Sequence, residues 1–104
     1  MRRTTRLKFL LAQRDALTLP GAANALFARV IEDHGFKACY VTGAGVANMH
    51  LGAPDIGLTT LTEIANAVAS IADAVDLPLM VDADTGFGNA LNMRRTVQAL
   101  ERAG

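Results

Sequence analysis

The sequence predicts an α/β protein with a parallel sheet. Short apolar runs alternate with longer stretches of helical periodicity along the chain, and strands that alternate with helices pair in parallel through right-handed crossovers. Hydrophobic residues make up 51% of the 104 residues and charged residues 19%. This balance is typical of a packed globular core and excludes a disordered chain.

The N-terminal part predicts a helix, a strand and a second helix. Leucines recur at three- and four-residue spacing over residues 7–11, as in an amphipathic packing helix that keeps its charges in water. The apolar run at residues 16–19 predicts the first strand, and the Pro-Gly pair after it ends that strand. The second helix is expected over residues 24–34, with Asn24 as its N-cap and Gly35 as its stop.

The middle of the chain predicts a buried strand, a long loop and a helix. Residues 37–42 (KACYVT) form an almost unbroken apolar run, which suits a parallel strand covered on both faces. A loop is expected over residues 43–58. The next helix is expected to begin with Thr60 or Thr62 as its N-cap and to end near Val75.

The last strand and helix complete the pattern. Residues 77–83 predict the third strand, and residues 90–103 predict a helix that Gly104 ends. Three parallel strands leave unpaired edges, and a (β/α)8 barrel needs eight β/α units and about 250 residues. We therefore expect residues 1–104 to be a partial TIM-barrel domain. It would hold an N-terminal helix and about three β/α units, and it would be truncated after the third barrel helix.

Composition excludes several classes of partner. The 10 basic and 10 acidic residues give a formal net charge of zero, so no long-range field gathers nucleic acid or an anionic membrane. Cys39 is the only cysteine, which excludes an internal disulfide and suits a reducing compartment. The apolar run at residues 9–12 is too short for a signal peptide. We expect a cytoplasmic protein with no nucleic-acid or membrane partner.

Two acids, Asp82 and Asp84, are the first candidates for chemistry; they lie in the segment VDADTGFG, residues 81–88. Strand alternation would send both to one side at the carboxyl end of the third strand, where parallel barrels place reacting groups. Carboxylates about 6 Å apart repel by roughly 3 kcal/mol at an effective dielectric of about 20, so a cation or a bound proton is needed. Oxygen ligands favour Mg²⁺ or Mn²⁺. A role in capping or turn formation is an alternative of equal weight.

The segment TGAG, residues 42–45, is the second candidate. Its glycines would let backbone N–H groups approach a carboxylate, a phosphate or an oxyanion. A dinucleotide-binding fingerprint fails, because Asn48 stands where its third Gly or Ala is needed. Taken alone, this glycine pair indicates a tight turn more than a binding site. Cys39 is expected to be a core residue rather than a nucleophile.

Four segments together resemble the isocitrate lyase/phosphoenolpyruvate (PEP) mutase superfamily. They are YVTGAG (40–45), LGAPD (51–55), LPLMVDADTGFG (77–88) and TVQALERAG (96–104). The resemblance spans essentially the whole chain and is greatest to the branch of methylisocitrate lyase, dimethylmalate lyase and oxaloacetate decarboxylase. It implies a β/α barrel enzyme that forms or cleaves a C–C or P–C bond beside a 2-oxo acid or enolpyruvate unit.

The resemblance also implies roles for individual residues. Asp82 and Asp84 would hold Mg²⁺, or Mn²⁺ in its place, and Asp82 would also contact the substrate. Asp55 corresponds to a further acid near the metal and would be catalytic. The residues that would bind the carboxylate substrate and line its pocket are Tyr40, Thr42, Gly43 and Ala44.

These roles imply a Mg²⁺-dependent lyase or decarboxylase. It would cleave a C–C bond in a small 2-oxo or 2-hydroxy di- or tricarboxylate through an enolate, whose charge a metal and N–H donors stabilise. In the family, later strands supply an arginine, a further acid and a mobile loop with a Lys-Lys/Arg-Cys-Gly-His pattern. We therefore expect the isolated chain to be inactive and the full-length family member to be a homo-oligomer.

Three other functions remain open from the sequence. Phosphonomutase or carboxyphosphonoenolpyruvate-type P–C chemistry belongs to the same superfamily, and the loop that separates it from C–C chemistry follows the fourth strand. A noncatalytic assembly module would form if partial barrels completed one another's sheets along the third strand. Nucleotide binding through the Gly43 loop ranks lowest.

Overall fold

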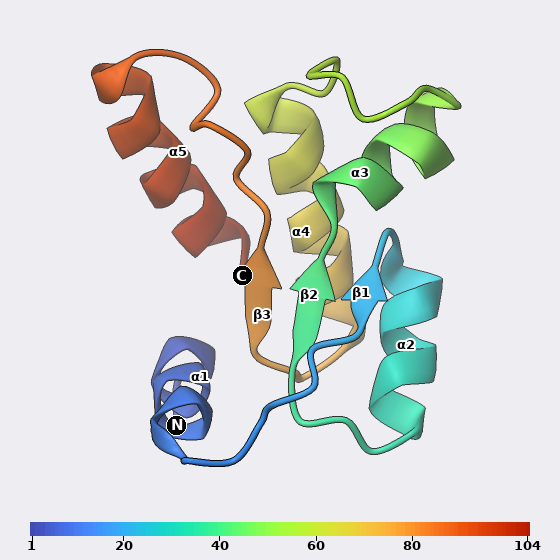
Figure 1. Ribbon diagram of the computed structural model, residues 1–104, viewed down its shortest axis with the longest axis vertical. Coiled ribbons are helices and arrows are strands. Elements are labelled where there is room, and N and C mark those ends of the chain that lie inside the picture. Colours follow the sequence, from blue (N-terminus) through green and yellow to red (C-terminus); the bar gives the residue numbers. More distant parts are fainter.

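The computed structural model describes residues 1–104 and contains one parallel sheet of three strands, in the order β1-β2-β3. The strands are β1 (Gly21–Ala22), β2 (Cys39–Val41) and β3 (Leu79–Val81), and they point in the same direction (Figure 1). The middle strand, β2, is paired on both sides. The predicted α/β class and the parallel sheet are confirmed.

The four predicted long helices are all present. α2 (Ala25–Asp33), α4 (Leu61–Ala74) and α5 (Ala90–Ala103) lie side by side, with α4 between the other two (Figure 1). α1 (Arg3–Ala12) lies near the amino ends of the strands. None of these helices has the length and apolar character needed to cross a lipid bilayer.

Side-chain caps explain where α2 and α4 begin. Asn24 Oδ1 accepts a hydrogen bond from the N–H three residues later, at 3.0 Å. Thr60 Oγ1 accepts from the Glu63 N–H at 3.2 Å, and Glu63 Oε1 accepts from the Thr60 N–H at 3.1 Å, which completes a capping box. The predicted Asn24 cap is confirmed, and Thr60 rather than Thr62 starts α4.

The core lies between the sheet and the helices. Cys39 and Val41 of β2 are buried together with Ile64 and Ile71 of α4. Each fully buried aliphatic side chain of this size stabilises the fold by about 1.5–3 kcal/mol. Because side chains alternate along a strand, Tyr40 between the two buried residues points to the opposite face of the sheet.

The predicted position of the first strand is wrong. Pairing starts at Pro20, whose carbonyl accepts a hydrogen bond from the Tyr40 N–H at 2.9 Å, rather than within residues 16–19. A proline fits this first position because it contributes only its carbonyl group. Residues 16–18 instead line a hollow beside α1, before the sheet begins.

The predicted loop over residues 43–58 is wrong in its first half. α3 (Gly43–Val46) follows β2 almost directly and continues into a π-helical turn, η1 (Ala47–Leu51). Thr42 starts α3, because its Oγ1 accepts a hydrogen bond from the Gly45 N–H at 3.1 Å. The helix was not predicted from the sequence because the segment contains two glycines, and glycine disfavours helix interiors.

The α1 helix is attached by arginines as well as by its leucine face. None of its residues is fully buried. The Arg3 guanidinium donates hydrogen bonds to the carbonyls of Ala72 and Val75, at 2.7 Å each, and Arg6 pairs with the Asp76 carboxylate at 3.1 Å. The expectation that its charges lie in water is therefore wrong for these two arginines. The reason is that the last carbonyls of α4 lack partners within the helix and attract cationic donors.

Candidate functional site

Three segments of the chain meet at the carboxyl edge of the sheet. Tyr40 lies in β2, Gly43 begins α3, and Asp82 follows β3. Figure 1 shows α3 and the segment after β3 leaving the same end of the sheet. The Asp82 N–H donates to the Val41 carbonyl at 3.0 Å, so the pairing of β2 with β3 continues beyond Val81. A Cβ placed on Gly43 would lie 3.0 Å from Asp82 Oδ2. This short distance shows how closely the start of α3 approaches the carboxylate.

Tyr40 lies in the electrostatic field of this edge. Its own burial, followed by the carboxylates of Asp82 and Asp55, raises the pKa of the Tyr40 phenol above its ordinary value of 10.0. The phenol therefore stays protonated at neutral pH and can donate a hydrogen bond. Asp55 is exposed in the loop after η1, yet it is close enough to act on Tyr40.

The loop after β3 holds Asp82 and Asp84 in a turn. β3 ends at Val81, so regular strand alternation does not extend through both acids, and a turn places them instead. Asp84 has a φ of 48°, in the left-handed region that Asp tolerates better than most residues. Its N–H donates to Asp82 Oδ1 at 2.9 Å. The turn alternative is confirmed for the backbone, and it leaves Asp82 Oδ2 beside Gly43.

The side chains of these two acids offer oxygen atoms, the kind of ligand that Mg²⁺ takes. No group of three His, Cys, Asp or Glu side chains is placed to hold a metal. A three-ligand cage is not required, because Mg²⁺ keeps several waters and binds proteins through one or two carboxylates. Asp84 is exposed, and Asp82 is half-buried with one oxygen outside the turn. The donor set is oxygen only, which is the chemistry that Mg²⁺ and Mn²⁺ prefer.

Thr42 fixes the conformation of the backbone at the start of α3, which the sequence predicts to bind a carboxylate. Its hydroxyl caps α3, and its methyl group leaves no room at Gly45, where a Cβ would lie 2.4 Å from Thr42 Cγ2. The N–H groups of Gly43 and Ala44 open α3, and the first N–H groups of a helix have no partner within it. These two amides are available as donors to an anion.

Sequence reasoning missed the support that α5 gives to the loop after β3, residues 82–89, which we call the acidic loop. Thr96 is 0% exposed, and its Oγ1 donates to the Gly86 carbonyl at 2.7 Å. The Gly86 N–H donates to the Ala83 carbonyl at 2.9 Å and closes a turn. Helical periodicity carried no signal for Thr96, because its partner is a carbonyl group in a loop of irregular conformation.

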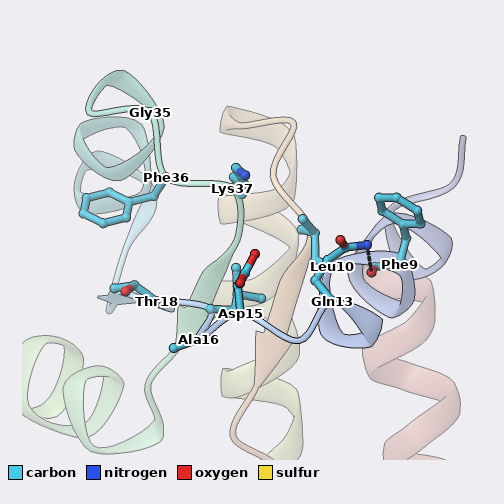
Figure 2. A pocket seen from close by; sticks show the side chains of 10 residues that line it. Phe9, Leu10, Gln13, Asp15, Ala16, Thr18, Gly35, Phe36 and Lys37 are labelled. Carbon is cyan, nitrogen blue, oxygen red and sulfur yellow. Dashed lines mark hydrogen bonds between the residues drawn. The ribbon is translucent and has the colours of Figure 1, made fainter.

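A separate hollow of about 390 Å³ lies at the amino end of the sheet (Figure 2). Phe9 and Leu10 of α1 line one side of it, and Phe36 and Lys37, before β2, line the other. The Gln13 side-chain amide donates to the Phe9 carbonyl at 3.2 Å. None of the residues that the sequence singles out for chemistry lines this hollow, so the carboxyl edge is the candidate site.

Known proteins are similar to this chain in sequence and in structure over nearly its whole length. The family model described as phosphoenolpyruvate phosphomutase matches residues 7–104. A probable 2-methylisocitrate lyase of Corynebacterium glutamicum is 51% identical over 98 residues, which cover 94% of this chain and 32% of that protein. The crystal structure of 2,3-dimethylmalate lyase, a PEP mutase/isocitrate lyase superfamily member, has a TM-score of 0.90 and 34% identity, covering 100% of this chain and 37% of that one. The structure of phosphonopyruvate hydrolase with oxalate and Mg²⁺ has a TM-score of 0.93 and 31% identity, covering 100% of this chain and 36% of that one.

The chain spans about a third of the length of the curated relatives it matches. The matched third includes the three strands, the acidic loop and the start of α3.

Proposed function

The chain belongs to the phosphoenolpyruvate phosphomutase family, within the PEP mutase/isocitrate lyase superfamily, and on that premise we propose that it supplies the metal- and carboxylate-binding part of a Mg²⁺-dependent carbon–carbon lyase. In this proposal residues 1–104 form the N-terminal portion of a (β/α)8 barrel. The observation that carries the proposal is the meeting of Tyr40, Gly43 and Asp82 at the carboxyl edge. Enzymes with this barrel place their reacting groups at that edge.

Sequence identity favours C–C chemistry. Relatives that match by sequence at 44–51% identity are named 2,3-dimethylmalate lyase, probable 2-methylisocitrate lyase and oxaloacetate decarboxylase. The substrate class that follows is a small 2-oxo or 2-hydroxy di- or tricarboxylate. Its carboxylates would be bound by the N–H donors of α3 and by the metal held at the acidic loop.

Each residue at the edge has a distinct part in this proposal. Asp82 and Asp84 would hold Mg²⁺, with water filling its other positions. When bound, Mg²⁺ supplies Lewis-acid stabilisation of negative charge on a substrate oxygen. The N–H groups of Gly43 and Ala44 orient a substrate carboxylate by donating hydrogen bonds to it. The protonated phenol of Tyr40 is a further donor to the same space.

Asp55 is assigned to proton transfer in this proposal. It is exposed in the loop after η1, and its charge acts on Tyr40. A carboxylate in that position can hold a proton and return it to substrate or to water. Thr42 contributes by capping α3, which fixes the two N–H donors that follow it.

Calorimetric titration of the 104-residue chain with MnCl₂ tests the metal assignment. We expect Mn²⁺ to bind and Asp84→Asn to weaken its affinity by about tenfold or more, because a neutral amide replaces a charged ligand. Asp73→Asn, on the exposed surface of α4, is the matched control and should bind as the wild type does. Oxalate is expected to bind only in the presence of Mn²⁺. Equal Mn²⁺ affinity in all three proteins would refute the assignment.

Phosphonate chemistry is the second candidate. The structural agreement with phosphonopyruvate hydrolase, at a TM-score of 0.93, favours it. Competition against oxalate on the Mn²⁺-loaded chain separates the two candidates. A C–C lyase site is expected to release oxalate to 2-methylisocitrate at lower concentration than to phosphonopyruvate, and a P–C site is expected to show the reverse order.

A further inference from the structure

A single buried hydrogen bond joins α5 to the acidic loop. Thr96 Oγ1 donates to the Gly86 carbonyl at 2.7 Å, and Thr96 is 0% exposed. It is the only side-chain hydrogen bond in the structure whose partners are both buried. A buried hydroxyl aimed at a loop carbonyl fixes that loop, because both groups would lack a partner if they separated.

This bond anchors one end of the loop that carries the two acids. At the other end, the Asp82 N–H is bonded to the Val41 carbonyl of β2. Between the two anchors, the Asp84 N–H is bonded to Asp82 Oδ1, and the Gly86 N–H closes a turn onto Ala83. Without the Thr96 bond, the Asp82 bond would be the one hydrogen bond that ties residues 82–86 to another element.

The loop conformation needs such an anchor. Asp84 and Phe87 both have positive φ, at 48° and 61°, and conformations of this kind in non-glycine residues persist when the surroundings hold them. α5 also packs tightly on the loop, since a Cβ on Gly86 would lie 2.5 Å from the Met93 Cε atom. The helix therefore determines where the loop lies.

We propose that Thr96 is a positioning residue for the acidic loop: its hydroxyl holds the Gly86 carbonyl so that Asp82 and Asp84 present their carboxylates together at the carboxyl edge. Thr96 acts through Gly86, because its one side-chain bond is to that carbonyl. The inference rests on the proposed function in one respect, namely that a divalent cation is what the two carboxylates bind.

Amide hydrogen exchange of the metal-free 104-residue chain tests the hold on the loop. Thr96→Val keeps the shape of the side chain and removes the donor, whereas Thr96→Ser keeps the donor. We expect the Asp84 and Gly86 amides to exchange about tenfold faster in Thr96→Val, and at close to the wild-type rate in Thr96→Ser. Thr62→Val, the same change at an exposed position of α4, should leave both amides unaffected.

Mn²⁺ titration of the same proteins tests the consequence for the metal. Thr96→Val is expected to weaken Mn²⁺ binding by up to about tenfold, or about 1.4 kcal/mol, which is near the upper end of the net contribution of one hydrogen bond. Thr96→Ser and Thr62→Val should bind as the wild type does. A loss of thermal stability alone, with no change in Mn²⁺ affinity, would show that Thr96 is merely structural and would overturn the proposal.

The two measurements separate failure of this inference from failure of the proposed function. If the wild type binds no Mn²⁺, the metal assignment fails, and amide exchange alone decides whether Thr96 holds the loop. If Mn²⁺ affinity falls in Thr96→Val without faster exchange at Asp84, the inference is overturned. If Thr96→Val does not fold, Thr96→Ala replaces it, because Ala and Ser both lack the threonine methyl group and differ only in the hydroxyl.

Discussion

Tyr40 connects the sheet to both acidic segments of the candidate site. It lies in the middle strand, and the charges of Asp82 and Asp55 both act on its phenol. It is the only tyrosine, and the chain has no tryptophan. Its ultraviolet absorbance therefore reports on the carboxyl edge alone, which makes it a probe of the arrangement described above.

Asp82→Asn is expected to lower the Tyr40 pKa toward 10.0, because it removes a negative charge beside the phenol and leaves the burial in place. Since folding raises this pKa, the stabilising contribution of the neutral phenol is complete below about pH 10 and is lost as pH rises through the folded-state value. Ultraviolet titration measures the pKa, and urea unfolding at several pH values measures the loss. Asp73→Asn should titrate as the wild type does; an unshifted Tyr40 in Asp82→Asn would contradict the placement of the carboxylate.

The identities of the site residues were easier to predict from the sequence than their backbone conformations. Asp82 stands out in the sequence because it follows an apolar run, and that run does form β3. The turn at Asp84 could not be predicted, because its left-handed backbone depends on a hydrogen bond to Asp82 and on contacts from α5. Such contacts join segments that periodicity treats separately.

At the scale of elements, α1 and α4 are joined through backbone carbonyls. The guanidinium of Arg3 reaches the Ala72 and Val75 carbonyls at the C-terminal end of α4. Its ion pair with Asp76 contributes little, because Asp76 is 82% exposed and the two atoms are 3.7 Å apart. The hydrogen bonds to the carbonyls are therefore the main attachment that Arg3 provides.

Arg3→Ala is expected to reduce the free energy of unfolding by about 1–2 kcal/mol, because two carbonyls lose a charged donor. Arg3→Lys should recover only part of this loss, since one ammonium group cannot reproduce the fork of donors that a guanidinium presents. Urea unfolding followed by circular dichroism measures both. Lys8→Ala, on the exposed side of the same helix, is the control; an equal loss in Lys8→Ala would assign the effect to helix charge rather than to the carbonyl contacts.

The sequence predicted correctly whether each long element is a helix or a strand, but it did not always predict where the element begins and ends. Asn24 and Thr60 predicted helix starts correctly, because a cap is a local bond between residues three apart. β1 was misplaced because a strand is defined by its partner, and the carbonyl of Pro20 is the group that meets β2. α3 was missed because one threonine hydroxyl outweighs the low helix propensity of the glycines that follow it.

Across the molecule, the groups that could bind a metal or a carboxylate are gathered at the carboxyl edge of the sheet. Groups suited to proton transfer are few. Carboxylates, free N–H groups and a protonated phenol meet at the carboxyl edge. Cys39 is buried, and burial raises the pKa of its thiol, so no reactive thiolate is available at neutral pH. The described residues thus favour binding of a metal and a carboxylate over turnover.

The 104-residue chain is therefore expected to bind Mn²⁺ and oxalate and yet to release no 2-oxo acid from 2-methylisocitrate above the rate in buffer. The physical reason is that a proton donor works only when it is held against the fragment that takes up the proton, whereas Asp55, the one acid of the edge outside the proposed metal pair, is exposed in a loop. A coupled assay of 2-oxo acid formation in the presence of Mg²⁺ measures the rate, with Asp84→Asn as the control. Mg²⁺-dependent release that Asp84→Asn abolishes would contradict this expectation, and it would mean that Asp55 suffices for proton transfer without the rest of a full-length relative.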